Sequence, residues 1–100
     1  MYFCAYNRAV VKLQWDAVKA RSNLRKHGVD FADAAEVLAD DAAITVPDTA
    51  PDEQRWITLG ADPACEVLVV VYTWRGETIR LISARRATPR ERRQYEEARR

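Results

Sequence analysis

The hydrophobic and polar positions of the chain change period several times, and each period predicts a type of element. Residues 10–15, "VVKLQW", alternate closely enough to form a short strand. Helical spacing follows in residues 16–28, "DAVKARSNLRKHG", and again in residues 30–40, "DFADAAEVLAD", where the apolar residues gather on one face. The first part of the chain therefore predicts one strand followed by two short helices.

Signals at the helix ends support these two helices and indicate a third. Asp16 and Asp30 are predicted N-caps, because a carboxylate accepts hydrogen bonds from the free backbone N–H groups of a first helical turn. Gly28 is the predicted left-handed C-cap of the first helix. Residues 88–91, "TPRE", predict the start of the last helix, since the Thr and the Glu form a capping box and the Pro suits the first helical position.

The remaining chain is rich in Val, Ile, Thr, Trp and Tyr, a composition typical of strands. The predicted strands are residues 42–47, 55–62, 65–74 and 78–85. The third of these is apolar for so long that we expect a central strand covered on both faces. The resulting order, β-α-α-β-β-β-β-α, predicts the α+β class, with a small antiparallel sheet, two N-terminal helices and one C-terminal helix.

Alternation within residues 78–85, "TIRLISAR", predicts where their side chains point. Successive side chains of a strand lie on opposite faces of the sheet. Arg80 is therefore expected on one face, with Ile82 and Ala84, and Arg85 on the opposite face, with Leu81.

The chain length of 100 residues indicates one compact domain, residues 1–100. Regular patterning starts only near Val10, so residues 1–10 are expected to be a loose N-terminal extension, or the product of a start site assigned too early. Cys4 and Cys65 form no disulfide or metal-ligand pattern. No stretch has the character of a signal peptide or a membrane span, which indicates a cytoplasmic protein.

The formal net charge of +1 conceals strong segregation along the chain. Residues 12–27 hold five basic residues against one acidic residue, whereas residues 30–53 hold eight acidic residues and no basic one. Residues 75–100 hold nine arginines and four glutamates. A fold that brought residues 12–27 beside residues 75–93 would display a basic patch able to bind phosphates.

Most enzyme signatures are absent from the sequence. There is no glycine-rich phosphate loop, no Cys-x-x-Cys pair and no His-Glu-x-x-His motif, and no cofactor is implied. His27 is the single histidine, which rules out a His-based metal cluster. It either acts alone as an acid or base, or satisfies carbonyl groups at the end of its helix.

The arginines are more informative, because a guanidinium stays charged and matches a phosphate with two donors at once. Arg85, Arg86 and Arg90 crowd the corner between the last strand and the last helix. Like charges gathered in this way need an anion, an acidic partner or open water. Arg80 either joins them in binding phosphates or pairs with a carboxylate across the sheet, such as Glu53 or Glu66.

Glu53 and Arg55 form a second candidate group, because residues two apart in a strand share a face. A carboxylate beside a guanidinium is either a base next to a phosphate clamp or a surface ion pair. Aromatic residues such as Trp15, Trp56 and Trp74 either stack on bases or belong to the core.

The chain from Trp15 to Glu97 closely resembles the BrnT family, toxin components of bacterial type II toxin–antitoxin systems. The most distinctive parts are "KHGV", residues 26–29, and "ISARRAT", residues 82–88. This resemblance implies a compact RelE-like ribonuclease that halts translation. It also implies a BrnA-like antitoxin partner with a ribbon-helix-helix DNA-binding part, through which alone the toxin would meet operator DNA.

The implied chemistry is cleavage of RNA without a metal, in which the 2′-hydroxyl attacks its own phosphate, a base accepts the proton and cations stabilise the phosphoryl charge. The catalytic candidates are Arg55, Arg80 and Arg85 for the charge, and Lys26, His27 and Glu53 for proton transfer. The candidates for binding RNA are Trp15, Lys19, Arg86 and Arg90. Two alternatives remain open: a non-catalytic module that acts as co-repressor with its antitoxin, and a small domain whose arginines bind only an acidic peptide.

Overall fold

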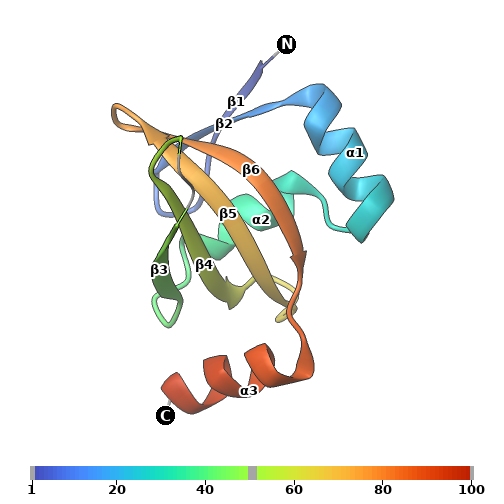
Figure 1. Ribbon diagram of the computed structural model, residues 1–100, viewed down its shortest axis with the longest axis vertical. Helices are drawn as coiled ribbons and strands as arrows, with labels where there is room; N and C mark the ends of the chain where they lie inside the picture. The colour runs from blue at the N-terminus through green and yellow to red at the C-terminus, as the bar shows by residue number, and fades with distance from the viewer. Residues whose placement is uncertain (1, 50–51, 100) are drawn as a thin grey trace.

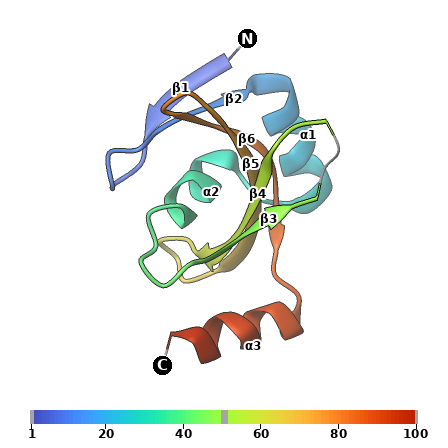
Figure 2. The ribbon, with the colours of Figure 1, turned by 60° about the vertical axis from the view of Figure 1, so that its left-hand side comes forward.

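The computed structural model describes residues 2–49 and 52–99. Their elements are β1 (Tyr2–Tyr6), β2 (Lys12–Asp16), α1 (Ala17–His27), α2 (Phe31–Val37), β3 (Ile44–Asp48), β4 (Arg55–Ala61), β5 (Val67–Arg75), β6 (Thr78–Arg86) and α3 (Pro89–Ala98). Within this part of the chain, six strands form one sheet in the order β1-β2-β6-β5-β4-β3. Figures 1 and 2 show α1 and α2 beside the twisted sheet and α3 at the end opposite the N-terminus. The predicted α+β class is confirmed.

The sheet is mixed, which corrects the prediction of a purely antiparallel sheet. β2 runs parallel to β6, with Leu13 opposite Ile79 and Gln14 opposite Arg80, whereas the other neighbouring strands are antiparallel. The two parallel strands lie far apart in the sequence, so no local pattern sets their relative direction. A parallel pair requires a long crossover, and here the crossover begins with α1 and α2.

Residues 1–10, expected as a loose extension, contain the edge strand β1. It pairs antiparallel with β2 from Tyr2 opposite Asp16 to Tyr6 opposite Lys12. Its side chains are mostly exposed, which explains why this segment lacks the apolar alternation of a core strand.

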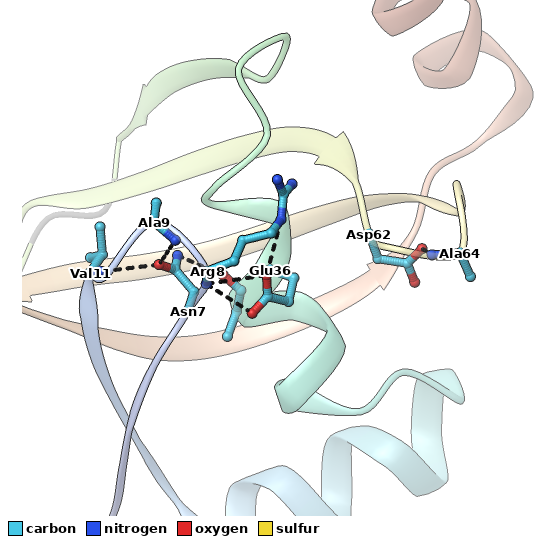
Figure 3. Close-up of polar contacts among 8 residues, drawn as sticks. Asn7, Arg8, Ala9, Val11, Glu36, Asp62 and Ala64 are labelled. Atoms are coloured by element: carbon cyan, nitrogen blue, oxygen red, sulfur yellow. Dashed lines mark hydrogen bonds and ion pairs between the residues drawn. The ribbon is translucent and has the colours of Figure 1, made fainter.

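The turn between β1 and β2 is fastened to α2 by polar contacts, which Figure 3 shows in detail. The buried Asn7 donates from Nδ2 to the carbonyl oxygen of Ala35 at 3.1 Å. Its Oδ1 accepts from the backbone N–H groups of Ala9 and Val11, both at 3.0 Å. Arg8 forms an ion pair with Glu36 at 3.2 Å. The N-terminal hairpin is thus anchored to the body of the protein.

The predicted helix caps are confirmed and explain where the helices begin and end. Asp16 accepts from the N–H of Val18, and Asp30 accepts from that of Ala32. Gly28 has a φ of 70°, the left-handed geometry that ends α1. A complete capping box formed by Thr88 and Glu91 begins α3. No helix in the described residues is long and apolar enough to cross a membrane.

The main core lies between one face of the sheet and the helices α1 and α2. It consists of Leu13, Trp15, Val29, Phe31, Ala34, Ala35, Val37, Leu68, Val70, Tyr72, Ile79, Leu81 and Ala84. A smaller core on the opposite face consists of Leu59, Val67, Val69, Ala87 and Tyr95, the last from α3. β5 contributes to both cores, as expected for its long apolar run.

A register shift between β5 and β6 alters the side-chain directions of β6. Val71 pairs with Ser83, whereas Tyr72 pairs with Leu81, so Ile82 has no partner in β5. One extra residue of this kind reverses the alternation of the strand beyond it.

The prediction that Arg80 and Arg85 lie on opposite faces is therefore wrong. Arg80 pairs with Thr73 and Arg85 pairs with Val69. Thr73 and Val69 share one face of β5, because an even number of positions separates them. Ala84 instead belongs to the buried face, among the core residues beneath α1 and α2. Both arginines consequently lie on the face of the sheet opposite the main core.

Candidate functional site

A cleft of about 120 Å³ lies on the sheet face opposite the main core. The strand β1, whose Tyr2 lines this cleft, lies at the end of the molecule opposite α3 (Figure 1). Six elements contribute to it: β1, β2, α1, β4, β5 and β6, together with Glu53 from the segment that leads into β4. Its lining residues are Tyr2, Asp16, Lys19, Glu53, Arg55, Thr73, Arg75, Arg80, Leu81 and Ile82. Four of the candidates from the sequence, Lys19, Glu53, Arg55 and Arg80, thus meet in one place.

Arg55 and Arg80 approach the cleft from the two strands that flank β5. Arg80 lies opposite Thr73 in β5, and Arg55 lies one position beyond the Trp56–Tyr72 pair. The Nε atoms of both arginines are buried and have no hydrogen-bond partner among the described residues. Neither guanidinium forms an ion pair with a carboxylate in the described part of the chain. Two buried cationic donors without partners favour the binding of an anion.

Glu53 lines the same cleft as Arg55. It lies two residues before β4, so the predicted sharing of one strand face by Glu53 and Arg55 is not what brings them together. It forms an ion pair with Arg75 at 3.3 Å rather than with Arg55 or Arg80. The neighbouring backbone is fixed by the buried Thr73, whose Oγ1 donates to the carbonyl oxygen of Gln54 at 2.7 Å. A carboxylate is thereby held beside two guanidinium groups that it does not neutralise.

A second hollow, of about 190 Å³, adjoins this cleft. Lys26 and His27 line it, and it shares Lys19 and Ile82 with the first cleft. The buried Asn23 connects α1 to β6, since it donates to the carbonyl oxygen of Ala84 and accepts from the N–H of the same residue. The basic residues of α1 therefore lie beside β6, the arrangement that the segregated charges suggested.

Arg85, a catalytic candidate, lies on the same face as Arg80 but lines neither hollow. Its guanidinium donates two hydrogen bonds to Glu91, at 2.8 and 3.0 Å. These bonds raise the pKa of Arg85 and lower the pKa of Glu91 to about 2. Glu91 also belongs to the cap of α3, so Arg85 connects β6 to the start of that helix.

Three of the predicted RNA-binding residues lie outside the cleft. Arg86 donates to Glu66 at 2.9 Å and to the carbonyl oxygen of His27 at 3.2 Å, which satisfies the end of α1. Arg90 is exposed in the first turn of α3. Trp15 is 9% exposed, with its ring stacked on Phe3 and edge-on to Phe31. Its position in the core gives Trp15 a packing role and leaves no ring face for a base.

Three residues of the cleft are absent from the sequence predictions: Tyr2, Thr73 and Arg75. The Tyr2 ring lies against the Arg80 guanidinium, with 4.5 Å from Cζ to the ring centroid. Alternate residues of β5 share one face, and along this face Val69 and Val71 are followed by Thr73 and Arg75. This change from apolar to polar side chains could have indicated that Thr73 and Arg75 belong to a polar site. Tyr2 had no such signal, because its neighbour Arg80 is brought beside it only by the β1–β2–β6 pairing.

The arrangement suits the binding of a phosphate beside a proton acceptor. The described residues contain no group of three or more His, Cys, Asp or Glu side chains that could hold a metal ion. Positive charge in the cleft comes instead from guanidinium and ammonium groups, which bind phosphoryl oxygens through charge-assisted hydrogen bonds.

Comparisons with known proteins agree on one family. A family model described as "Ribonuclease toxin, BrnT, of type II toxin-antitoxin system" matches residues 15–91. The chain is also similar to the ribonuclease toxin BrnT of Brucella abortus, known from a 1.1 Å crystal structure. That match has a TM-score of 0.61 and 30% sequence identity, and it covers 74% of this chain and 92% of the Brucella chain. No curated protein matches the chain.

Proposed function

The chain belongs to the BrnT family of ribonuclease toxins from type II toxin–antitoxin systems, and we propose that it is an endoribonuclease whose active site is the cleft between Arg55 and Arg80. The observation that carries this proposal is the pair of guanidinium groups with buried, unpartnered Nε atoms in a cleft that also holds a carboxylate. Single-stranded RNA offers what the cleft lacks, a phosphate with a nucleophilic hydroxyl beside it.

In the proposed reaction, the 2′-oxygen of the RNA forms a bond to the adjacent phosphorus, and the bond from phosphorus to the 5′-oxygen breaks. Glu53, held by Arg75, accepts the proton of the 2′-hydroxyl. Arg55 and Arg80 stabilise the charge that develops on the phosphoryl oxygens. The products are a 2′,3′-cyclic phosphate and a 5′-hydroxyl, which takes up a proton as it leaves.

Lys19 is assigned to the RNA backbone, because it lines both the cleft and the adjoining hollow. Lys26 and His27 line only that hollow, so either can protonate the leaving oxygen when the RNA runs from the cleft past Lys19. Arg85, Arg86 and Arg90 receive no catalytic role in this proposal.

We further propose that cleavage proceeds without a metal ion, since Arg55 and Arg80 supply the positive charge that a metal would otherwise provide. Loss of RNA integrity would then halt translation in the cytoplasm. A BrnA-like antitoxin with a ribbon-helix-helix part would neutralise the chain and carry it to operator DNA. The compact arrangement of a sheet with helices at its start and end is compatible with a RelE-like fold.

The decisive experiment incubates the purified chain with single-stranded RNA in the presence of EDTA and identifies the cleavage products. The wild type should release fragments with cyclic phosphate ends. Arg55→Ala and Arg80→Ala should each lower the rate by about 100- to 1,000-fold, the usual cost of removing one group that stabilises developing charge. Arg92→Ala removes the same charge from the exposed surface of α3 and should cleave like the wild type.

Induced expression provides the matching experiment in cells. The wild type should arrest growth with loss of RNA, and the folded Arg80→Ala variant should not. A folded wild type that leaves RNA intact under both conditions would overturn the nuclease proposal. If the same chain then strengthened operator binding only when the antitoxin was present, the co-repressor function would replace it.

A further inference from the structure

Tyr2 contributes to the cleft from a strand that lies outside the family match. The matched region covers residues 15–91, whereas β1 spans Tyr2–Tyr6. Asp16 of β2 is the strand partner of Tyr2, and Gln14 of β2 is that of Arg80. The β1–β2–β6 order thus places the ring of Tyr2 against Arg80, a candidate catalytic residue. The distance from the Arg80 Cζ to the Tyr2 ring centroid is 4.5 Å.

We propose that Tyr2 is a positioning residue for Arg80, whose guanidinium it supports from one face so that the N–H donors are directed at a phosphate in the cleft. This inference rests on the proposed function and deepens it, because it assigns part of the active-site geometry to β1.

The contrast with other arginines of β6 shows what an aromatic support achieves. Arg85 is held by Glu91 and Arg86 by Glu66, and in each case a carboxylate occupies the N–H donors. The Tyr2 ring attracts the face of the guanidinium and leaves its edge free. Arg80 is therefore ordered without losing either its donors or its positive charge.

The position of the Tyr2 ring is determined by the strand rather than by a free terminus. The next residue, Phe3, stacks on the buried Trp15 with 6.1 Å between ring centroids. At the other end of β1, Asn7 is bonded to α2. Removal of all of β1 would consequently expose Trp15, so the proposal is better tested with single substitutions at the half-exposed Tyr2.

The test compares Tyr2→Leu, which removes the ring, with Tyr2→Phe, which keeps the ring face. Tyr2→Leu should lower kcat/KM for RNA cleavage by about 2- to 5-fold, the factor that corresponds to the roughly 0.5–1 kcal/mol of a cation–π contact at an exposed site. Tyr2→Phe should cleave like the wild type. Tyr6→Leu alters another exposed tyrosine of β1, one that lies outside the cleft, and should also leave cleavage unchanged.

A double-mutant cycle separates positioning through Arg80 from any independent effect. Its readout is affinity for a 2′-O-methyl RNA, which cannot be cleaved. Tyr2→Leu should weaken this affinity in the wild-type background and have no further effect in the Arg80→Ala background. Equal losses in both backgrounds, or no loss in either, would overturn the inference. A wild type that shows this coupling but cleaves no RNA would overturn the proposed function and leave the role of Tyr2 intact.

Discussion

Arg80 and Arg85 lie on the same face of the sheet, although an odd number of positions separates them in β6. The cause is Ile82, which has no partner in β5. The shift also moves Ala84 to the buried face, where its N–H and carbonyl groups bond to the side chain of Asn23 in α1. The strand pairs on either side of Ile82 thus set both the arginine surface and the attachment of α1, and Ile82 is accommodated between them as an extra residue.

Deletion of Ile82 should therefore preserve the directions of the other β6 side chains. Without Ile82, Ser83 directly follows Leu81, so simple alternation keeps Arg85 on the face of Arg80 and Ala84 in the main core. We expect cooperative unfolding with a loss of no more than about 3 kcal/mol of stability, because the pairing of β5 with β6 is retained and only the bulged residue is removed.

Ile82→Val is the matched control for this deletion and should remain folded with a small loss of stability, about 0.5–1.5 kcal/mol or less at this half-buried position. Thermal unfolding followed by circular dichroism measures both variants. A deletion variant that loses cooperative unfolding while Ile82→Val retains it would show that the fold requires the extra residue itself.

Local physics made the helix ends predictable from the sequence. Asp16, Gly28 and Thr88 each act within a few residues of their own position, so their caps follow from residue type and spacing. Glu53 and Arg55 both line the cleft, but Glu53 precedes β4, so strand alternation does not account for its position.

Contacts between distant segments were not predictable in this way. The parallel pairing of β2 with β6, the strand at Tyr2–Tyr6 and the unpaired Ile82 all depend on tertiary packing. The same limit applies to individual arginines. Arg85 and Arg80 look equivalent in the sequence, and only the position of Glu91 distinguishes a paired guanidinium from an unpaired one.

The Arg85–Glu91 pair predicts how stability depends on acidity. The Arg85 hydrogen bonds and the Thr88 backbone N–H lower the pKa of Glu91 from 4.5 to about 2. Between these two pKa values the unfolded chain binds more protons than the folded chain. The contribution of the Arg85–Glu91 pair to the free energy of unfolding is therefore complete above about pH 4.5 and is lost as the pH falls toward 2. Glu91→Gln should cost roughly 1–2 kcal/mol at pH 7, after allowance for solvent screening of the half-exposed Arg85.

Urea unfolding of the wild type and Glu91→Gln at several pH values tests this dependence, with Glu96→Gln as an exposed control on the same helix. The difference between wild type and Glu91→Gln should shrink as the pH is lowered through this range. A difference that stays constant down to pH 2 would contradict the assignment.

Tyr95 attaches α3 through a hydrogen bond to the Asp40 carboxylate, which also accepts from the N–H groups of Ala42 and Ala61. Burial acts to raise the pKa of Asp40, but these hydrogen bonds outweigh it and leave that pKa below its ordinary value. Burial and the same carboxylate raise the pKa of Tyr95 to about 12. Tyr95→Phe should therefore cost about 1.5–3 kcal/mol, the usual range for a hydrogen bond to a charged group.

The loss of stability caused by Tyr95→Phe should be present at pH 7 and should decline as the pH rises from about 10 toward 12. The reason is that Tyr95 ionises at a lower pH in the unfolded chain than in the folded protein. RNA cleavage should be unchanged at temperatures where the variant is folded, because Tyr95 and Asp40 lie outside the cleft. Unfolding midpoints and cleavage rates of one preparation test both statements. A large fall in the cleavage rate of the folded Tyr95→Phe variant would indicate that α3 takes part in the site.

The salt dependence of RNA binding tests whether the cationic side chains contact phosphates. Each phosphate neutralised on a single strand contributes about −0.7 to the slope of log K against log salt concentration. If Lys19, Arg55 and Arg80 each neutralise one phosphate, the slope for an uncleavable 2′-O-methyl RNA should be about −2. Arg80→Ala should make the slope about 0.7 less steep, whereas Arg92→Ala, which alters α3 outside the cleft, should keep the wild-type slope. A slope near zero for the wild type would mean that the cleft binds no phosphate, and a slope changed equally by both variants would place the RNA on the general surface of the protein.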